Sequence, residues 1–242
     1  MDLTVLGCSG SFGSPSGGAC SGYLLRSGQT AIWMDCGNGT FANLQHHIPV
    51  EDVDAIVISH LHPDHCVDLY GAHVLLHYGL EKTNVPVYGP AGHEARLGAL
   101  VEDWGETFAW HEIGDGDSAT VGDIDLRFSR TDHPPPTFAV EARGDAKRLI
   151  YTSDTGPKWS VDAFEVGADL VLSEATYAHA NKPAPLHLSA HEAGAAARAA
   201  RARRLMITHL WPRLDPQAMA EEAAESFGAA VTLAAPHQRI HI

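Results

Sequence analysis

Short apolar runs bounded by glycine, serine, aspartate or proline recur along the whole chain. Such runs are typical of buried strands, because the turn residues end each run before a helical period can be established. The runs alternate with a few longer segments rich in alanine and leucine. We therefore expect strands at residues 3–6, 23–25, 31–35, 55–58, 85–90, 107–113, 118–121, 124–130, 138–142, 148–152, 169–172, 204–213 and 231–233.

The longer segments have the length and residue types of helices. Ser189 stands directly before one of them and three residues before Glu192, which is the spacing of a capping box. The stretch 7–22 is rich in glycine and serine and predicts a flexible loop, with one wall of a substrate cleft as the alternative. The predicted helices are 41–47, 64–78, 92–104, 190–204 and 215–227.

Length and composition predict a single domain that covers residues 1–242. Apolar residues make up 45% of the chain, which is enough for a sizeable core. No apolar run approaches the roughly 20 residues of a membrane-spanning helix. The first residues lack the basic segment of a signal peptide and lead straight into a strand-like run. We expect a cytoplasmic protein without membrane contact.

Charge and cysteine content narrow the function further. The net charge of −14 argues against a general nucleic-acid binder, because it repels polyanions. A small anionic substrate is compatible with this net charge if metal ions supply positive charge at the site. Cys8, Cys20, Cys36 and Cys66 have no CxxC spacing and form no dense framework, which predicts reduced thiols. The oligomeric state stays open, a homodimer included.

The candidate chemistry is concentrated in the stretch 59–65, which directly follows a predicted strand. His60 and His62 stand two apart, so both can turn to one ion from a loop, as they could not from a helix face. Asp64 and His65 open the next predicted helix and can reach a second ion nearby. Imidazole nitrogen and carboxylate oxygen are ligands that first-row metals prefer. The alternative is surface decoration in a chain that holds sixteen histidines.

Further metal donors stand after later predicted strands. Prolines keep His133 off regular structure at one strand end, and Asp132 beside it is the weaker alternative. Asp154 follows another strand, and a carboxylate can bridge two cations through its two oxygens. His209 is delivered by a strand near the end of the chain. Asp35 can orient a metal ligand or simply cap a turn.

The string HLHPDH at 60–65 resembles the H-x-H-x-D-H signature of the metallo-β-lactamase superfamily. This resemblance implies an α+β fold, a four-layer αββα sandwich in which the residues up to Arg130 form one lobe. It implies a dinuclear site along one edge, with zinc as the first expectation and manganese or iron compatible with the same donors. It assigns His60, His62, His133 and Asp154 to one ion, and Asp64, His65, Asp154 and His209 to the other.

Later motifs resemble the RNase Z-like branch of this superfamily. SEAT at 173–176 and HLS at 187–189 are similar to its HEAT and HST elements, and THLWPR at 208–213 is similar to the segment with its last ligand. LGCSGS, TSDTGP and HLSAHEAG look like compact bacterial phosphodiesterases, including those that cleave cyclic nucleotides. His133 and Asp154 stand only 21 positions apart, which leaves no room for the tRNA-gripping insertion of tRNA-processing members. The resemblance implies a phosphodiesterase rather than a β-lactamase, glyoxalase or lactonase.

We therefore predict a hydrolase that cleaves a small phosphodiester, such as a cyclic nucleotide, by attack of a metal-bridging hydroxide. His187 is the predicted general acid for the leaving alkoxide, Glu174 holds its tautomer, and Asp64 completes the predicted catalytic residues. A surface histidine and an exposed carboxylate are the simpler interpretations of His187 and Glu174. Trp211 or Phe138 could stack on a base. The alternative functions are an RNase Z-type tRNA 3′-endonuclease, a lactone or thioester hydrolase on the same metals, and a non-catalytic binding protein.

Overall fold

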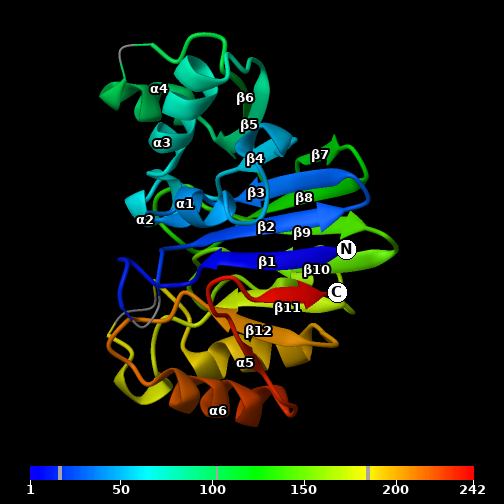
Figure 1. Cartoon of the computed structure of the whole chain (residues 1–242). Helices are drawn as coiled ribbons and strands as arrows, with labels where there is room; N and C mark the ends of the chain where they lie inside the picture. Colours follow the sequence, from blue (N-terminus) through cyan, green and yellow to red (C-terminus); the bar gives the residue numbers. More distant parts are fainter. Residues whose placement is uncertain (16–17, 102, 184–185) are drawn as a thin grey trace.

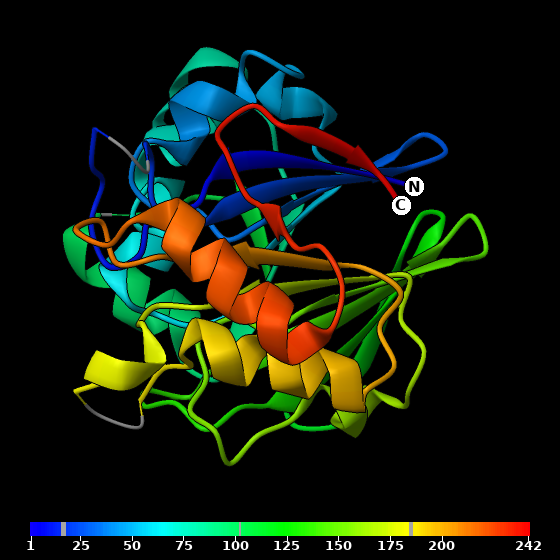
Figure 2. The ribbon, with the colours of Figure 1, turned by 90° about the horizontal axis from the view of Figure 1, so that it is seen from below.

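The computed structural model describes residues 1–15, 18–101, 103–183 and 186–242. Two β-sheets pack face to face, and helices cover both outer faces (Figure 1). Seen from below, α5 and α6 lie on one side of the sandwich, and the helices of the first half of the chain lie on the other (Figure 2). The chain thus has the four-layer αββα architecture expected from its sequence.

The first sheet has the strand order β14-β1-β2-β3-β4-β5-β6. Its strands are antiparallel from β14 to β3 and parallel from β3 to β6. The bounds are β1 (Asp2–Gly7), β2 (Gly22–Ser27), β3 (Thr30–Met34), β4 (Ala55–Val57), β5 (Val85–Pro90), β6 (Phe108–Ile113) and β14 (Arg239–His241).

The second sheet has the strand order β13-β12-β11-β10-β9-β8-β7. Its strands are antiparallel from β7 to β10 and parallel from β10 to β13. The bounds are β7 (Ser118–Val121), β8 (Ile124–Arg130), β9 (Phe138–Gly144), β10 (Lys147–Tyr151), β11 (Leu170–Glu174), β12 (Leu205–Thr208) and β13 (Thr232–Leu233).

Helices pack on the outer face of each sheet through their apolar sides. One buried cluster joins the first sheet to its helices, and another joins the second sheet to α5 and α6. Ser189 starts α5 with the predicted capping box, in which its side chain and that of Glu192 satisfy each other's backbone N–H groups. The helices are α1 (Thr40–Leu44), α2 (Pro63–Cys66), α3 (Leu69–Val74), α4 (His93–Leu97), α5 (Ala190–Ala199) and α6 (Pro216–Phe227), with 3₁₀ turns η1 (Val50–Asp52), η3 (Gly98–Leu100), η4 (Val161–Phe164) and η5 (His179–Asn181) and a π turn η2 (Leu75–Gly79).

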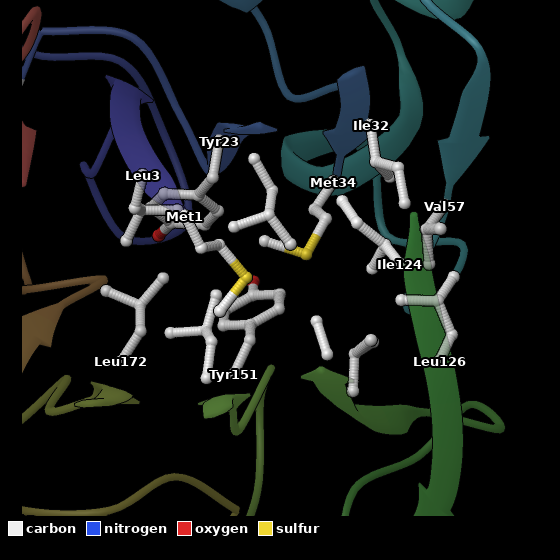
Figure 3. Packing of buried hydrophobic residues seen from close by; sticks show 14 of the residues in the cluster. Met1, Leu3, Tyr23, Ile32, Met34, Val57, Ile124, Leu126, Tyr151 and Leu172 are labelled. Carbon is white, nitrogen blue, oxygen red and sulfur yellow. The ribbon is translucent and has the colours of Figure 1, made fainter. Parts of the chain in front are cut away.

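The central core lies between the two sheets and contains side chains from both (Figure 3). Tyr23 of β2 and Met34 of β3 enter this core from the first sheet, and Leu126 of β8 and Tyr151 of β10 enter it from the second. On β8, buried and accessible residues alternate, as expected for a strand with one face on a core. This packing fixes the two sheets, and therefore the ends of their strands, relative to each other.

The candidate metal donors follow strands that end at one edge of this sandwich. Strand β8 is antiparallel to β9, which is antiparallel to β10, and β10 is parallel to β11 and β12. The carboxyl ends of β8, β10, β11 and β12 therefore meet at the same edge of the second sheet. Residues that follow these strands, although far apart in sequence, are brought close together there.

Four of the five predicted helices are shorter than expected: the helix predicted at 41–47 ends at Leu44, and the one predicted at 92–104 ends at Leu97 and continues as the turn η3. The segment 64–78 is divided into α2, α3 and η2, because Asp68 at the break binds backbone groups of other segments: its N–H donates to Cys36 and its carboxylate accepts from Phe41. The segment predicted at 190–204 ends at Ala199, since Arg201 adopts a φ of +54°. Such contacts arise from the tertiary fold and override the local helical pattern.

The prediction that the residues up to Arg130 form one lobe is wrong. Strands β7 and β8 belong to the second sheet, where β8 pairs along its length with β9. Strand β14, which the sequence analysis did not predict, completes the first sheet beside β1. Within the described part of the chain, no helix has both the length and the apolar character needed to cross a membrane.

Candidate metal centre

The structure brings together all seven side chains that were predicted to bind metal. Together with His187, which was predicted as a general acid, they fall into groups whose ligand atoms lie within 4.8 Å of one another, a spacing that could hold an ion. Four loops and one short helix at the strand edge supply the seven predicted ligands. The groups are His60, His62, His133 and Asp154; Asp64, His65 and His209; and Asp154, His187 and His209.

Asp154 lies between the first two groups, with one carboxylate oxygen facing each. Its Oδ2 lies 3.6 Å from Nε2 of His60 and 3.9 Å from Nε2 of His133. Its Oδ1 lies 3.3 Å from Nε2 of His65 and 3.5 Å from Nε2 of His209. Two ligands of a tetrahedral zinc ion, each about 2.1 Å from it, are roughly 3.4 Å apart. The carboxylate is therefore placed to bridge two cations.

Asp64 and His62 complete the two groups from the solvent side. Oδ2 of Asp64 lies 3.3 Å from Nε2 of His209 and 3.6 Å from Nε2 of His65. His62 faces its group with Nδ1, which lies 3.0 Å from Nε2 of His60. Pro63 stands at the first position of α2, so the chain turns into a helix that carries Asp64 and His65 directly after the loop.

Four of these histidines have their Nδ1 atoms hydrogen-bonded to groups outside the cluster, which turns Nε2 toward its centre. Such contacts fix ring orientation and tautomer at metal sites. The pairs are His60 with Ser59 Oγ (3.1 Å), His65 with Asp35 Oδ2 (2.7 Å), His133 with Leu186 O (2.9 Å) and His209 with Thr176 Oγ1 (2.8 Å).

Asp35 is fully buried and organises the floor of the cluster. Besides His65, its carboxylate accepts hydrogen bonds from the backbone N–H and hydroxyl of Ser59 and from the hydroxyl of Tyr151. Asp35 itself has a φ of +56°, a left-handed conformation that aspartate tolerates better than most residues. Of its two sequence-based interpretations, the geometry agrees with the orientation of a metal ligand.

Unsatisfied buried atoms show that the cluster suits a cation. Nε2 of His65 and Oδ1 of Asp154 are buried without a hydrogen-bond partner. Burial alone would raise the pKa of Asp154, but the imidazoles of His209 and His65 hold the pKa well below its usual value. Burial also lowers the pKa of His60 well below its usual value, which keeps that imidazole neutral and able to coordinate. The donor set therefore fits divalent ions.

His187 stands at the edge of the cluster and is held by Glu174. Its Nδ1 lies 3.1 Å from Oε1 of Glu174 and 3.8 Å from Oδ2 of Asp154. Burial lowers the pKa of His187, but the charge and hydrogen bond of Glu174 and the charge of Asp154 raise it to about 9. His187 is therefore not the surface residue of the simpler interpretation, because a buried carboxylate holds its side chain in place. In the apo protein it is protonated at neutral pH.

Glu174 is itself buried and fully engaged, contrary to the simpler interpretation of an exposed carboxylate. It accepts hydrogen bonds from the backbone N–H groups of Thr155 and Leu188 and from the hydroxyl of Thr176. Thr176 also contacts Nδ1 of His209, so one side chain links Glu174 to a candidate metal ligand. Thr176 was not predicted as a functional residue, although its place in the SEAT motif, two residues after Glu174 and on the same side of an extended segment, was a signal for it.

Other candidates from the sequence lie outside the cluster. The carboxylate of Asp132, the weaker alternative to His133, accepts a hydrogen bond from the backbone of Lys158, and Asp132 belongs to none of the candidate metal groups among the described residues. Phe138 is only 5% exposed and packs in the core between the sheets, so it cannot stack on a base. The outer partners Ser59 and Tyr151 were also missed, since their contacts depend on the tertiary fold.

Comparisons with known proteins agree with this geometry. A family model described as a beta-lactamase superfamily domain matches residues 30–210. Rv1339 of Mycobacterium tuberculosis is 35% identical over 237 residues, which cover 93% of this chain and 86% of that protein. YhfI of Bacillus subtilis, named a probable metallo-hydrolase, is 32% identical over 219 residues and 87% of each chain.

A solved structure and a further relative are also similar to this chain over nearly its whole length. The crystal structure of YhfI from Bacillus subtilis matches with a TM-score of 0.89 and 26% identity, over 99% of this chain and 98% of that one. A ribonuclease Z of Haloarcula marismortui is 26% identical over 294 residues, which cover 97% of this chain and 94% of that protein. The chain therefore belongs to the β-lactamase superfamily and is a metallo-hydrolase.

Proposed function

We propose that this hydrolase is a phosphodiesterase that acts on small phosphodiesters, cyclic nucleotides among them, with two divalent ions, zinc in the first place. One ion would be held by His60, His62, His133 and Asp154, and the other by Asp64, His65, Asp154 and His209. The bridging position of Asp154 and its orphaned Oδ1 support this assignment. Since residues that follow strands of both sheets would supply ligands, we propose that residues 1–242 form one catalytic domain.

The pair formed by His187 and Glu174 carries the proposal. When bound, the ions would supply an acidified water as nucleophile and positive charge for the phosphoryl oxygens. A phosphodiester releases an alkoxide, which needs a proton. His187 donates that proton from Nε2, because Nδ1 is engaged by Glu174. The buried carboxylate of Glu174 stabilises the protonated imidazole until transfer.

The charge balance favours a small anion over a polyanion. Two divalent ions outweigh the carboxylates of Asp64 and Asp154, so an anionic phosphodiester is attracted at the site itself. The surrounding chain has a net charge of −14 and repels a long nucleic acid. A ribonuclease cleaves the same kind of bond, so the relative named ribonuclease Z supports phosphodiester chemistry.

The segment between His133 and Asp154 argues against tRNA as the substrate. Most of it forms the hairpin β9–β10 within the second sheet. The two strands pair along their length, with Lys147 opposite Gly144 at one end and Tyr151 opposite Val140 at the other. This hairpin is part of the sandwich and leaves no arm to grip a tRNA. A thioester hydrolase on the same ions is another alternative, but its thiolate leaving group makes less use of a proton donor such as His187 than an alkoxide does. A lactone hydrolase would release an alkoxide, as a phosphodiesterase does, so the choice between these two depends on the assay of both substrate classes.

The test is a turnover assay of purified protein loaded with zinc or manganese. We expect metal-dependent hydrolysis of bis-p-nitrophenyl phosphate and of cyclic AMP, and none by an Asp154→Ala variant that is folded by circular dichroism. Hydrolysis of lactones or thioesters without phosphodiesters, or cleavage of a precursor tRNA in preference to small substrates, would replace the proposal by one of its alternatives. Retention of nucleotide without turnover would indicate a binding protein.

A further inference from the structure

Three aromatic side chains, Tyr177, Trp211 and Phe12, form a row that starts at His187; we call them the aromatic row. The ring of Tyr177 stands edge-on to His187, with centroids 5.9 Å apart. Trp211 follows at 6.2 Å from Tyr177, with an interplanar angle of 36°. Phe12 is T-shaped against Trp211 at 5.4 Å. The row thus leads outward from the edge of the metal centre.

The backbone ties these three segments together. The N–H of Trp211 donates to the carbonyl of Thr176, next to Tyr177, at 3.1 Å. In the loop after β1, Gly10 donates to the carbonyl of Leu210, next to Trp211, at 3.0 Å. Three separate parts of the chain therefore place their rings side by side. Because Trp211 stands two residues after the candidate ligand His209, these rings lie at the edge of the sandwich that carries the metal donors.

The aromatic row is not needed for the hydrophobic core. Tyr177, Trp211 and Phe12 belong to none of the three buried clusters, nor to the partly buried residues packed against them. Phe12 is 42% exposed, and the other two are half-buried. Exposed aromatic rings that gather beside a site are typical of ligand recognition rather than of packing.

We propose that the aromatic row is a stacking platform for a nucleobase, so that the substrate is a nucleotide and not a phosphodiester of a lipid or a simple sugar. This inference rests on the proposed function, because His187 then marks the side of the leaving group. A ribose hydroxyl that leaves at His187 carries its base one sugar ring farther on, where Tyr177 and Trp211 lie. The platform deepens the proposed function by naming the substrate class.

Stacking also suits the charge of this protein. Base–aromatic contact needs no positively charged side chain and accepts every base, because each base has a π-face. Stacking one base is worth about a 5- to 150-fold gain in affinity, equivalent to ~1–3 kcal/mol. A platform of two or three rings would therefore decide whether a nucleotide is held at all in an acidic protein.

The experiment compares AMP with ribose 5-phosphate, which lacks the base, by calorimetric titration of the zinc-loaded protein. We expect AMP to bind about tenfold more tightly or better. Trp211→Leu and Tyr177→Leu keep apolar bulk but cannot stack, so each should remove most of this advantage and leave the affinity for ribose 5-phosphate within about twofold. Trp211→Phe and Tyr177→Phe should retain most of the advantage. Tyr78→Leu is the matched control, because Tyr78 is an exposed aromatic residue away from the row.

Equal affinity of the wild type for AMP and ribose 5-phosphate would overturn the platform, and so would Leu variants that weaken both ligands equally. Hydrolysis of bis-p-nitrophenyl phosphate, measured on the same samples, tests the proposed function separately. A preference for AMP without any phosphodiester hydrolysis would leave the platform in place and reject the phosphodiesterase. Hydrolysis without a preference for AMP would do the reverse.

Discussion

Nδ1 of His65 lies 2.7 Å from Oδ2 of Asp35, and both side chains are completely buried. Asp35 follows β3, whereas His65 lies in α2, so the contact joins two segments of the first sheet's edge. It leaves Nε2 of His65 facing Asp154 at 3.3 Å. The orientation of one candidate ligand therefore depends on a carboxylate that does not itself touch the metal position.

We expect Asp35→Asn to weaken metal binding or activity by about 10- to 100-fold, because outer partners of this kind orient the ligating imidazole. Metal content by elemental analysis and kcat/KM with bis-p-nitrophenyl phosphate measure the effect. Asp68→Asn is the matched control, since Asp68 is a neighbouring carboxylate that binds the backbone of Phe41. An Asp35→Asn protein with full metal content and wild-type kinetics would contradict the role of Asp35.

Asp154→Ala should remove metal and activity together. Its two oxygens face both halves of the cluster, so the loss should exceed the 10- to 100-fold cost of changing an outer partner. Elemental analysis after gel filtration should find fewer than two ions per chain, and turnover should fall to background. Near wild-type activity in this variant would show that Asp154 does not bridge.

His187→Gln should retain both ions and lose turnover. General acid catalysis contributes about 10²- to 10⁴-fold, and the loss should be largest where the leaving group is a poor one. The measurement is kcat for a series of phosphodiesters with leaving groups of rising pKa. The variant should be least impaired with p-nitrophenol and most impaired with an alkoxide. Equal impairment across the series would instead place His187 among the metal ligands, as the third candidate group would allow.

The pKa of His187 also predicts a pH dependence of stability in the metal-free protein. Glu174 raises this pKa to about 9, above the ordinary 6.5, so the pair stabilises the fold fully below pH ~6.5. The stabilisation declines as pH rises through about 9, where the folded state loses the proton. Urea unfolding of wild type and His187→Gln should therefore differ most near pH 6 and least near pH 9.5. A pH-independent difference would contradict the ion pair.

The thiols should be unreactive in the native state. Burial raises the pKa of Cys8 and of Cys66 to about 12 and that of Cys20 to about 11, so little thiolate exists at pH 8. All four cysteines are buried. Ellman's reagent should label the native protein slowly and titrate four thiols after unfolding in guanidinium chloride. Rapid labelling of the native protein would show that one of these sites opens.

Most of the candidate metal centre was predictable, because each donor follows a buried strand that the hydrophobic pattern reveals. His60, His133, Asp154 and His209 all stand within a few residues of such a strand end. The hydrophobic pattern predicted the strands and helices, whereas the four-layer sandwich and the site along its edge were implied by the resemblance of HLHPDH to the metallo-β-lactamase signature. What remained undetermined was which strands share a sheet.

The missed features depend on contacts between distant parts of the chain. Strand β14 is short and its residues are exposed or half-buried, so no apolar run marks it; it exists because β1 offers an unpaired edge. Thr176 lies within the SEAT motif and Tyr151 in an ordinary strand, but the contacts of both form only when His209 and Asp35 come within reach. Local pattern cannot encode a partner that the fold supplies from far away.

The ligands come from both halves of the sandwich: the loop after β4 and helix α2 belong to the first sheet, and the loops after β8, β10 and β12 belong to the second. Ions bound by ligands from both halves would stabilise the contact between the two halves. Cleavage of the link between β6 and β7 would then give two fragments, each with an incomplete coordination set. A chelator would then prevent the two fragments from associating, and added zinc would restore their association.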